Sequence, residues 1–234
     1  MKQKLLRIFH PPCAGMLSAL VVCSMMFTGP AHSDGGLGTL QDLLPPREEQ
    51  SSKRAFDGRI RLFDHFLFYP MPVWSLVANG PAPAERSQFQ RSRHKNAFRL
   101  DVVPKDEKFD DWNSRFSIIA FDNQNHPITT QATRLANYFR SECSPSNLRV
   151  FPGNRTQTKM VMVAACGNYS RKKDKGEMAA AIILKQGDIN VTVMRQWRGP
   201  NFQARIRSQW PVSKSEIDGV LNELVRSKLV PAGS

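Results

Sequence analysis

Four apolar segments in the second half of the chain, joined by short polar links, restrict the fold most strongly. These segments are residues 148–151, 159–166, 178–184 and 189–197. In the last segment Ile189, Val191 and Val193 fall on one face of an extended chain, and the residues between them fall on the other. The polar link 168–176 and the pair Gly187-Asp188 have the composition of hairpin turns. Because short links join antiparallel neighbours, this half of the chain predicts an antiparallel sheet.

The first half of the chain contains further candidate strands. Residues 97–103 alternate apolar with polar or smaller side chains, and residues 116–121 form a short apolar run, so we predict a strand in each. The aromatic segment 60–77 is interrupted by two prolines, which predicts a short element, a turn and then a strand carrying Trp74. Acidic residues at the start of 106–112 favour a short helical turn there.

Two amphipathic helices complete the predicted fold. Thr129 or Thr130 can cap the first helix, which ends near Cys143. Its apolar positions follow the i, i+3, i+4, i+7 rule and are Ala132, Leu135, Ala136 and Phe139. The second helix begins with a capping box, Ser213 to Glu216, and carries the stripe Ile217, Val220, Leu221, Leu224 and Val225. The sequence therefore predicts an α+β fold, a single domain of mainly antiparallel β-sheet packed with two helices.

The first 33 residues have the parts of an export signal. Three basic residues give a positive start, and residues 16–27 form an apolar core that is too short to span a membrane. Small residues at Ala31 and Ser33 then stand three and one positions before a cleavage point. We therefore expect a signal peptide that is cut after Ser33, and a mature protein that is periplasmic or secreted.

Two alternatives stay open for this segment. Acylation of Cys23 would tether the protein to a membrane, but a bacterial lipobox has a small residue before the cysteine and this chain has Val22 there. An uncleaved anchor is the other alternative. With simple cleavage the chain divides into a signal peptide at 1–33, a flexible leader at 34–58, one α+β domain at 59–230 and a tail at 231–234.

Cysteine usage agrees with an oxidising compartment. Two of the four cysteines lie in the signal segment, which leaves Cys143 and Cys166. An isolated pair in such a compartment is more often a disulfide than a metal site or a catalytic thiol. A bond that closes a loop of about two dozen residues would stabilise the fold by about 3 kcal/mol. The alternative is a nucleophilic cysteine, which needs a histidine partner, and no remaining histidine has a recognisable catalytic context.

The chain is strongly basic. Its formal charge of +13 falls to +10 without residues 1–33, because they contain three basic and no acidic residues. Such a protein can contact lipid headgroups, polysaccharide, nucleic acid or an acidic protein, although scattered charge also serves solubility. The candidate binding surface consists of basic and indole side chains, namely Arg171, Lys172, Lys173, Arg195, Trp197, Arg198, Arg205, Arg207 and Trp210. Arginine beside indole can stack on sugars or bases and neutralise phosphate. Alternatively, the tryptophans cover the sheet edge and the arginines face water.

Recognised catalytic motifs are absent from the sequence. It contains no Gly-x-Ser-x-Gly elbow, no P-loop, no dinucleotide fingerprint and no His-Glu-x-x-His motif. The acidic cluster at 106–111 lacks the ligand spacing of a calcium loop. We therefore expect no cofactor, no metal and no catalytic residue. A hydrolase of unfamiliar type would need a pocket that joins His94 or His126 to Asp111 or Glu142.

The order of the predicted elements carries a resemblance to a known fold. A strand ends in Val102-Val103-Pro104-Lys105, an acidic turn runs into Trp112, a helix ends at Cys143, a strand ends at Cys166, and a helix lies near the end of the chain. Over about residues 60–230 this order resembles small exported bacterial proteins of the PsbP-like α/β/α sandwich type. The resemblance implies a non-enzymatic binding or assembly-assisting protein, and it supplies no site residues.

These observations lead to one functional expectation with two alternatives. We expect an exported accessory protein of the bacterial cell envelope that binds an envelope or secretion-system protein. The candidate partner contact is the aromatic set Phe66, Phe68, Tyr69 and Trp74. The first alternative is a basic protein that binds polyanions directly, with lipid or polysaccharide favoured over nucleic acid. The second is the unfamiliar hydrolase.

Overall fold

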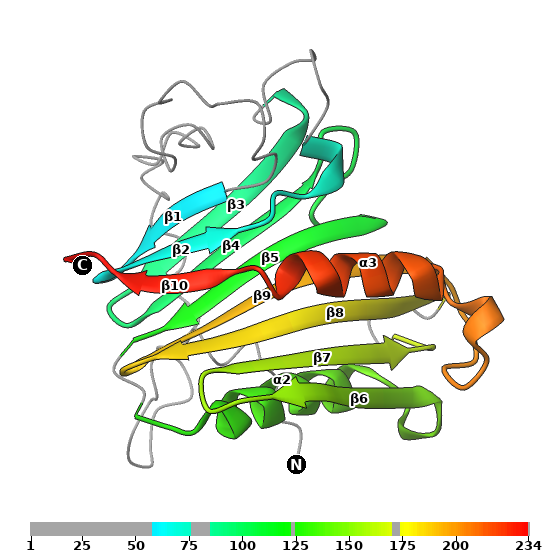
Figure 1. The fold of residues 1–234 in the computed structure, drawn as a ribbon. Coiled ribbons are helices and arrows are strands. Elements are labelled where there is room, and N and C mark those ends of the chain that lie inside the picture. The colour runs from blue at the N-terminus through cyan, green and yellow to red at the C-terminus, as the bar shows by residue number, and fades with distance from the viewer. Residues whose placement is uncertain (1–57, 76–84, 123–124, 170–173, 234) are drawn as a thin grey trace, which may run out of the picture.

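The computed structural model describes residues 58–75, 85–122, 125–169 and 174–233. The predicted signal peptide and leader lie outside the described residues, apart from Gly58 at the end of the leader. The described residues form one α+β domain of mainly antiparallel sheet with two α-helices, which confirms the predicted fold class (Figure 1).

Seven antiparallel strands form the large sheet. They are β3 (Ser87–His94), β4 (Ala97–Pro104), β5 (Ser114–Phe121), β6 (Leu148–Arg155), β7 (Lys159–Cys166), β8 (Lys175–Gln186) and β9 (Ile189–Pro200). Their order across the sheet is β3-β4-β5-β9-β8-β7-β6. Two meanders, β3 to β5 and β6 to β9, are therefore joined along β5 and β9. Each strand predicted at 97–103, 116–121 and in the second half is present.

A smaller sheet brings the two ends of the domain together. It contains β1 (Gly58–Leu62), β2 (His65–Tyr69) and β10 (Lys228–Pro231), in the order β1-β2-β10. Tyr69 faces the large sheet and stacks on Phe116 of β5, with their ring centroids 5.5 Å apart.

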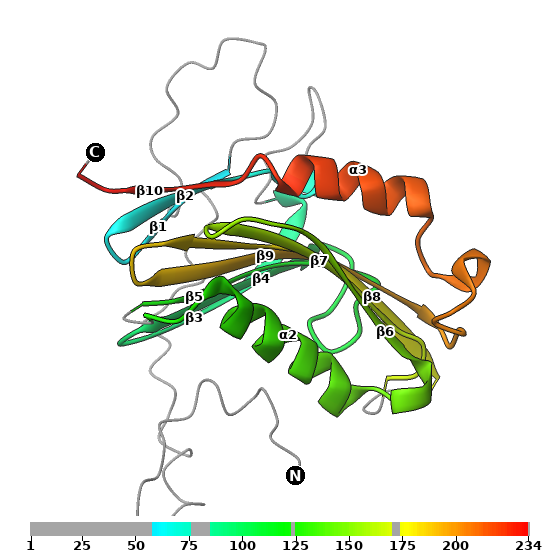
Figure 2. The ribbon, with the colours of Figure 1, turned by 60° about the horizontal axis from the view of Figure 1, so that its bottom comes forward.

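Two helices lie on opposite faces of the large sheet (Figure 2). Helix α2 (Ile128–Glu142) packs mainly on β6, β7 and β8, whereas α3 (Lys214–Leu224) packs on β8 and β9 beside the small sheet. We call these faces the α2 side and the α3 side. The core on the α3 side includes Leu100, Ile118 and Val193, and the core on the α2 side includes Phe139 and Met194.

The sequence predicts the residue that caps α3 correctly and the residue that caps α2 incorrectly. The Ser213 hydroxyl accepts the backbone N–H of Glu216 at 3.1 Å, so the predicted capping of α3 is confirmed. The predicted threonine cap of α2 is wrong, because the helix starts at Ile128 and Pro127 is its cap residue without a side-chain hydrogen bond. Proline fits this place because its fixed φ suits a helix start and it needs no donor there.

Two further local predictions differ from the structure. Trp74 lies in a short 3₁₀ turn, η2 (Val73–Ser75), and not in a strand, because Pro70 and Pro72 end the sheet pairing after Tyr69. Residues 106–112 form turns and bends in place of a helical turn. There the Glu107 carboxylate accepts the backbone N–H groups of Asn113 and Ser114 at 2.7 and 3.0 Å, which holds the chain in a loop.

Candidate functional site

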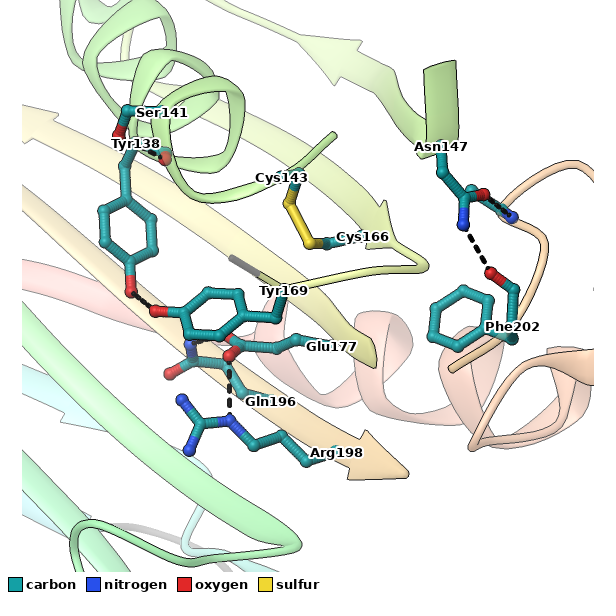
Figure 3. The surroundings of a disulfide bond; sticks show 11 residues. Tyr138, Ser141, Cys143, Asn147, Cys166, Tyr169, Glu177, Gln196, Arg198 and Phe202 are labelled. Atoms are coloured by element: carbon teal, nitrogen blue, oxygen red, sulfur yellow. Dashed lines mark hydrogen bonds and ion pairs between the residues drawn. A yellow bond between two sulfur atoms is a disulfide. The ribbon is translucent and has the colours of Figure 1, made fainter. Parts of the chain in front are cut away.

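The disulfide lies where α2 ends and β7 ends. Cys143 directly follows α2, Cys166 is the last residue of β7, and their Cα atoms are 5.7 Å apart (Figure 3). Both cysteines are buried, and Cys143 also forms a β-bridge with Tyr169. The predicted pairing is confirmed. The bond fixes the end of α2 to the sheet and positions the residues that follow Cys166.

The connection between β9 and α3, residues 201–213, is anchored beside this bond. The Asn147 amide donates to the Phe202 carbonyl and accepts the Ala204 N–H, both at 2.7 Å (Figure 3). The Phe202 N–H donates to the Gly167 carbonyl at 3.0 Å. Gly167 must be glycine here because a Cβ would overlap the Phe202 carbonyl oxygen. The start of the connection is therefore held firmly, although it has no regular structure.

The same connection presents basic and apolar side chains to solvent. Arg205, Ile206 and Arg207 are exposed, and Ile206 keeps 38% of its surface accessible. Trp210 is half-buried, its indole N–H donates to the Ala204 carbonyl at 3.2 Å, and its ring lies 6.1 Å from that of Phe151 in β6. We call Phe151, Arg205, Ile206, Arg207 and Trp210 the loop surface. Figure 1 shows this connection, in orange, projecting beyond the N-terminal end of α3.

A network of charged and polar side chains crosses the α2 side of the sheet. The strand register places three pairs directly opposite one another: Asp101 and Ser117, Arg115 and Gln196, and Glu177 and Arg198. Each pair is hydrogen-bonded, at 2.6, 2.9 and 3.0 Å respectively. The Gln196 amide also donates to Glu177 at 2.7 Å and its oxygen accepts Ser117 at 3.1 Å, which joins the pairs into one network. Directly opposed cross-strand pairs give a sheet much of its specificity.

The charges in this network are mutually stabilised. Burial would raise the pKa of the Asp101 carboxyl, but the charges of Arg99 and Arg115, with hydrogen bonds from Arg99 and Ser117, lower that pKa below its ordinary value. Burial would likewise lower the pKa of Arg115, but the carboxylates of Asp101 and Glu177 raise it. Both groups are therefore ionised at neutral pH.

Aromatic residues close the network from the α2 side. The Arg115 and Arg198 guanidinium groups lie 4.3 and 3.8 Å from the Trp112 ring. The hydroxyl groups of Tyr138 and Tyr169 are hydrogen-bonded at 3.0 Å near Glu177 (Figure 3). Burial is the main reason that both tyrosine pKa values are raised, so the hydroxyls stay protonated.

The structure does not bring the predicted binding surface together on one exposed face. Arg195 and Trp197 are buried on the α3 side, with 7% and 5% of their surfaces accessible. Arg198 points to the α2 side and pairs with Glu177. Arg205, Arg207 and Trp210 belong to the loop surface, and Arg171, Lys172 and Lys173 lie outside the described residues. Successive side chains of β9 alternate between faces, so Arg195 and Arg198 cannot share one.

Arg195 occupies an unusual environment. Its guanidinium lies 4.2 Å from the Trp74 ring, and its buried Nε has no hydrogen-bond partner among the described residues. Burial lowers its pKa to about 10, although the charges of Glu223 and Glu216 act in the opposite direction. The neighbouring Trp197 indole N–H donates to Glu216 of α3 at 3.1 Å, which ties β9 to that helix.

The predicted aromatic contact divides between two faces of the small sheet. Phe66 and Phe68 are half-buried on its outer face, where Arg59 lies 4.3 Å from the Phe66 ring. Tyr69 points inward and is buried, and Trp74 is half-buried against Arg195. Phe66 and Phe68 are therefore the two members of the set that share one face.

Neither of the following two cavities is lined by the groups that an unfamiliar hydrolase would need, which are His94 or His126 with Asp111 or Glu142. The larger cavity, of about 420 Å³, is lined by Arg61, Phe63, Asp64, Arg93 and Asp122. The second, of about 270 Å³, lies over β3, β4 and β5. Over the described ranges, His, Cys, Asp and Glu side chains form no cluster of three or more that could hold a metal ion. No α-helix in those ranges is long and apolar enough to cross a membrane.

The network residues on the α2 side were not predicted from the sequence. Asp101, Arg115 and Glu177 each lie within or beside a segment predicted as a strand, at positions that alternate with apolar residues. Charged residues in several strands of one sheet were the available signal. Their convergence depends on which strands are neighbours, and the sequence did not reveal that β5 pairs with β9.

Comparison with known proteins leaves the family open. No protein-family model matches the sequence, and no curated protein is significantly similar to it. Among solved structures, a mutant of the protein Mog1 superposes with a TM-score of 0.47 at 10% identity, over 76% of this chain and 97% of that chain. The Saccharomyces cerevisiae Ran-binding protein Mog1p gives a TM-score of 0.46 at 9% identity, with the same coverage. The resemblance to PsbP-like proteins stays a prediction.

Proposed function

We propose that this chain is an exported, non-enzymatic binding protein of the bacterial cell envelope, which assists an envelope or secretion assembly by contacting an acidic protein partner through the loop surface. The observation that carries the proposal is the anchored β9–α3 connection, which holds an exposed isoleucine between two exposed arginines. Loops that a rigid scaffold holds in place commonly carry binding residues.

The chemistry of the loop surface fits an acidic protein segment with an apolar side chain. Ile206 and Phe151 are each 38% accessible, and the half-buried Trp210 lies beside Phe151. Apolar and aromatic anchors surrounded by arginine are typical of the residues that dominate protein interfaces. Arg205 and Arg207 would attract carboxylates and set the orientation of the partner.

Two further observations support an exported protein. The disulfide between Cys143 and Cys166 is consistent with an oxidising compartment. The N-terminal segment has the pattern of a signal peptide with cleavage after Ser33, and the element order resembles exported PsbP-like proteins.

Site-specific photo-crosslinking in the native envelope tests this function. A photoreactive amino acid replaces Ile206 in one variant and Val225 in a control, because Val225 is 39% accessible and lies at the end of α3. We expect one reproducible protein adduct from position 206 that is absent from position 225. Reversal of charge at Arg205 and Arg207 should reduce that adduct at least tenfold, in line with a loss of more than about 1.4 kcal/mol. Identical adducts from both positions, or none from position 206, would contradict the proposal.

A second candidate function is direct polyanion binding, because the outer face of the small sheet is basic. The β-sheet register places Arg59 and Lys228 beside Phe68, and Arg61 beside Phe66. These side chains alternate with Ile60 and Leu67, which face the core, so the basic groups lie on the outer face. Three cations around two half-buried rings would suit lipid headgroups or polysaccharide.

Vesicle binding separates the two functions. Binding to vesicles that contain phosphatidylglycerol should weaken steeply between low and moderate salt if the polyanion function is correct. The double variant Arg61→Glu/Lys228→Glu should then lose binding, whereas Arg205→Glu/Arg207→Glu should keep it. Capture of one protein that Arg205→Glu/Arg207→Glu abolishes, together with no vesicle binding at low salt, supports the first function and contradicts the second.

A further inference from the structure

A cavity of about 270 Å³ opens on the α2 side of the large sheet. It lies over the meander β3 to β5, whereas α2 packs mainly on β6, β7 and β8. Its lining residues come from the three strands and from the β4–β5 connection, and they are Gln90, Ser92, Arg99, Asp101, Phe109 and Arg115. Gln90 and Ser92 are exposed and form its solvent side, while Asp101 and Arg115 are more than nine-tenths buried at its base.

The base of the cavity carries more positive than negative charge. Arg99 donates to both carboxylate oxygens of Asp101, at 2.6 and 3.3 Å, and this ion pair neutralises one guanidinium. Arg115 donates its Nε to the neutral amide of Gln196 at 2.9 Å. Two guanidinium groups and one carboxylate therefore line the cavity, which gives its walls a net charge of +1.

The guanidinium of Arg115 is also held in a fixed orientation. Arg115 lies 4.3 Å from the Trp112 ring and bonds to Gln196, so its position is set by the protein before any ligand arrives. Preorganised groups lose little freedom on binding, which increases affinity. The planar fork of an arginine matches the two oxygens of a carboxylate.

Phe109 supplies an apolar part of the cavity wall. Its side chain is half-buried in the β4–β5 connection and lines the same cavity. A site with one excess positive charge and one aromatic wall suits a monoanion with a small apolar group better than a free phosphate. The Ser92 hydroxyl and the Gln90 amide offer further hydrogen bonds at the solvent side.

We propose that this cavity binds a carboxylate that carries a small apolar group, with the carboxylate against Arg115 and the apolar group against Phe109. The ligand is either a small organic acid or an acidic side chain of a peptide, because both present the same chemistry. This site is separate in its residues from the loop surface, so the proposal does not depend on the partner contact described above.

Titration of the purified protein at low salt tests the proposal. The probes are benzoate, its neutral counterpart benzamide, phenyl phosphate, and an acetylated and amidated tripeptide with a central glutamate. We expect benzoate to bind at least tenfold more tightly than benzamide or phenyl phosphate. Preference for benzoate over the tripeptide identifies a small acid as the ligand, and the reverse preference identifies an acidic side chain.

Two variants of one strand locate the binding site. Ser92→Phe should fill the cavity from its solvent side and weaken benzoate binding at least tenfold, without removing any member of the buried network. Arg91→Phe places the same ring on the opposite face of β3 and should leave binding unchanged. Equal affinity of Ser92→Phe and the unchanged protein for benzoate, equal binding of benzamide, or no benzoate binding at millimolar concentration would overturn the proposal. Crosslinking at position 206 does not require a ligand in the cavity. A negative result in one experiment therefore contradicts one proposal and leaves the other unaffected.

Discussion

The two faces of the large sheet accommodate buried arginines in opposite ways. Strand β9 carries one on each side: Arg195 is buried on the α3 side, and Arg198 on the α2 side keeps 9% of its side-chain surface accessible. Arg198 lies 3.0 Å from a fully buried carboxylate, Glu177. Arg195 has aromatic neighbours, Trp74 and Trp197, and a buried Nε without a hydrogen-bond partner among the described residues.

The difference shows that the effect of a buried charge on stability depends on its neighbours. On the α2 side each charge has an opposite charge or a strong hydrogen-bond partner, so removal of one member leaves another uncompensated. On the α3 side the Trp74 ring offsets part of the cost of burying Arg195, and the charge itself lowers stability. The same residue type therefore supports the fold on one face and weakens it on the other.

Removal of the paired arginine should have the largest effect on stability. Arg198→Met leaves Glu177 buried without its cation, and we expect the free energy of unfolding to fall by about 4 kcal/mol. Urea denaturation at neutral pH measures this loss. The double variant Arg198→Met/Glu177→Gln should recover most of it, because the glutamine can still accept the Gln196 amide. A loss below about 1 kcal/mol in the single variant would contradict the pairing.

Asp101 makes the stability of the α2 side depend on pH in the acid range. Because the arginines lower its pKa in the folded state, the unfolded chain binds more protons in acid, so this contribution is complete above about pH 4 and is lost as pH falls further. Asp101→Asn should cost about 3 kcal/mol at pH 7 and make unfolding less sensitive to pH below about 4. Urea midpoints between pH 7 and pH 2 test both expectations. Asp188→Asn, at the exposed β8–β9 turn, is the control and should keep the acid dependence of the unchanged protein.

Removal of the buried charge on the α3 side should change the free energy of unfolding least, and with the opposite sign. Arg195→Met keeps a long side chain against Trp74 and removes the buried charge, so we expect unfolding to become harder by about 1 kcal/mol at neutral pH. Thermal and urea unfolding check the sign. Because burial lowers the Arg195 pKa to about 10, its cost should diminish above pH 10, and the advantage of the variant should shrink there. Destabilisation by Arg195→Met would show that the guanidinium makes a net favourable contribution.

Local signals predicted the elements better than they predicted the site. The capping box at Ser213 and the apolar stripe of α3 act within a few residues, so the sequence reveals them directly. Strand β3 was missed because its sequence, SQFQRSRH, contains a single large apolar residue, Phe89, and its other side chains are polar or charged. Its partner β4 supplies the apolar residues that bury this edge of the sheet.

The site depends on contacts between distant parts of the chain. Arg115 and Gln196 are 81 positions apart, and they meet because β5 pairs with β9. Arg195 and Trp197 were predicted at a binding surface because arginine beside indole can stack on sugars or bases and neutralise phosphate, but α3 packs over them. Neither the strand order nor the cover supplied by a later helix could be inferred from the composition of β9 itself.

The pairing of β10 with β2 has a consequence for how the domain is made. β10 contains some of the last residues of the chain, and its partner β2 contains some of the first in the domain. Non-local strand pairing is slow to form, because a long loop must close before any contact stabilises it. During synthesis the small sheet therefore waits for β10, and Leu67 lacks its cross-strand neighbour Leu229 until then. Because Leu67 belongs to the core on the α3 side and Leu229 packs against that core, the core is complete only after β10 has paired with β2.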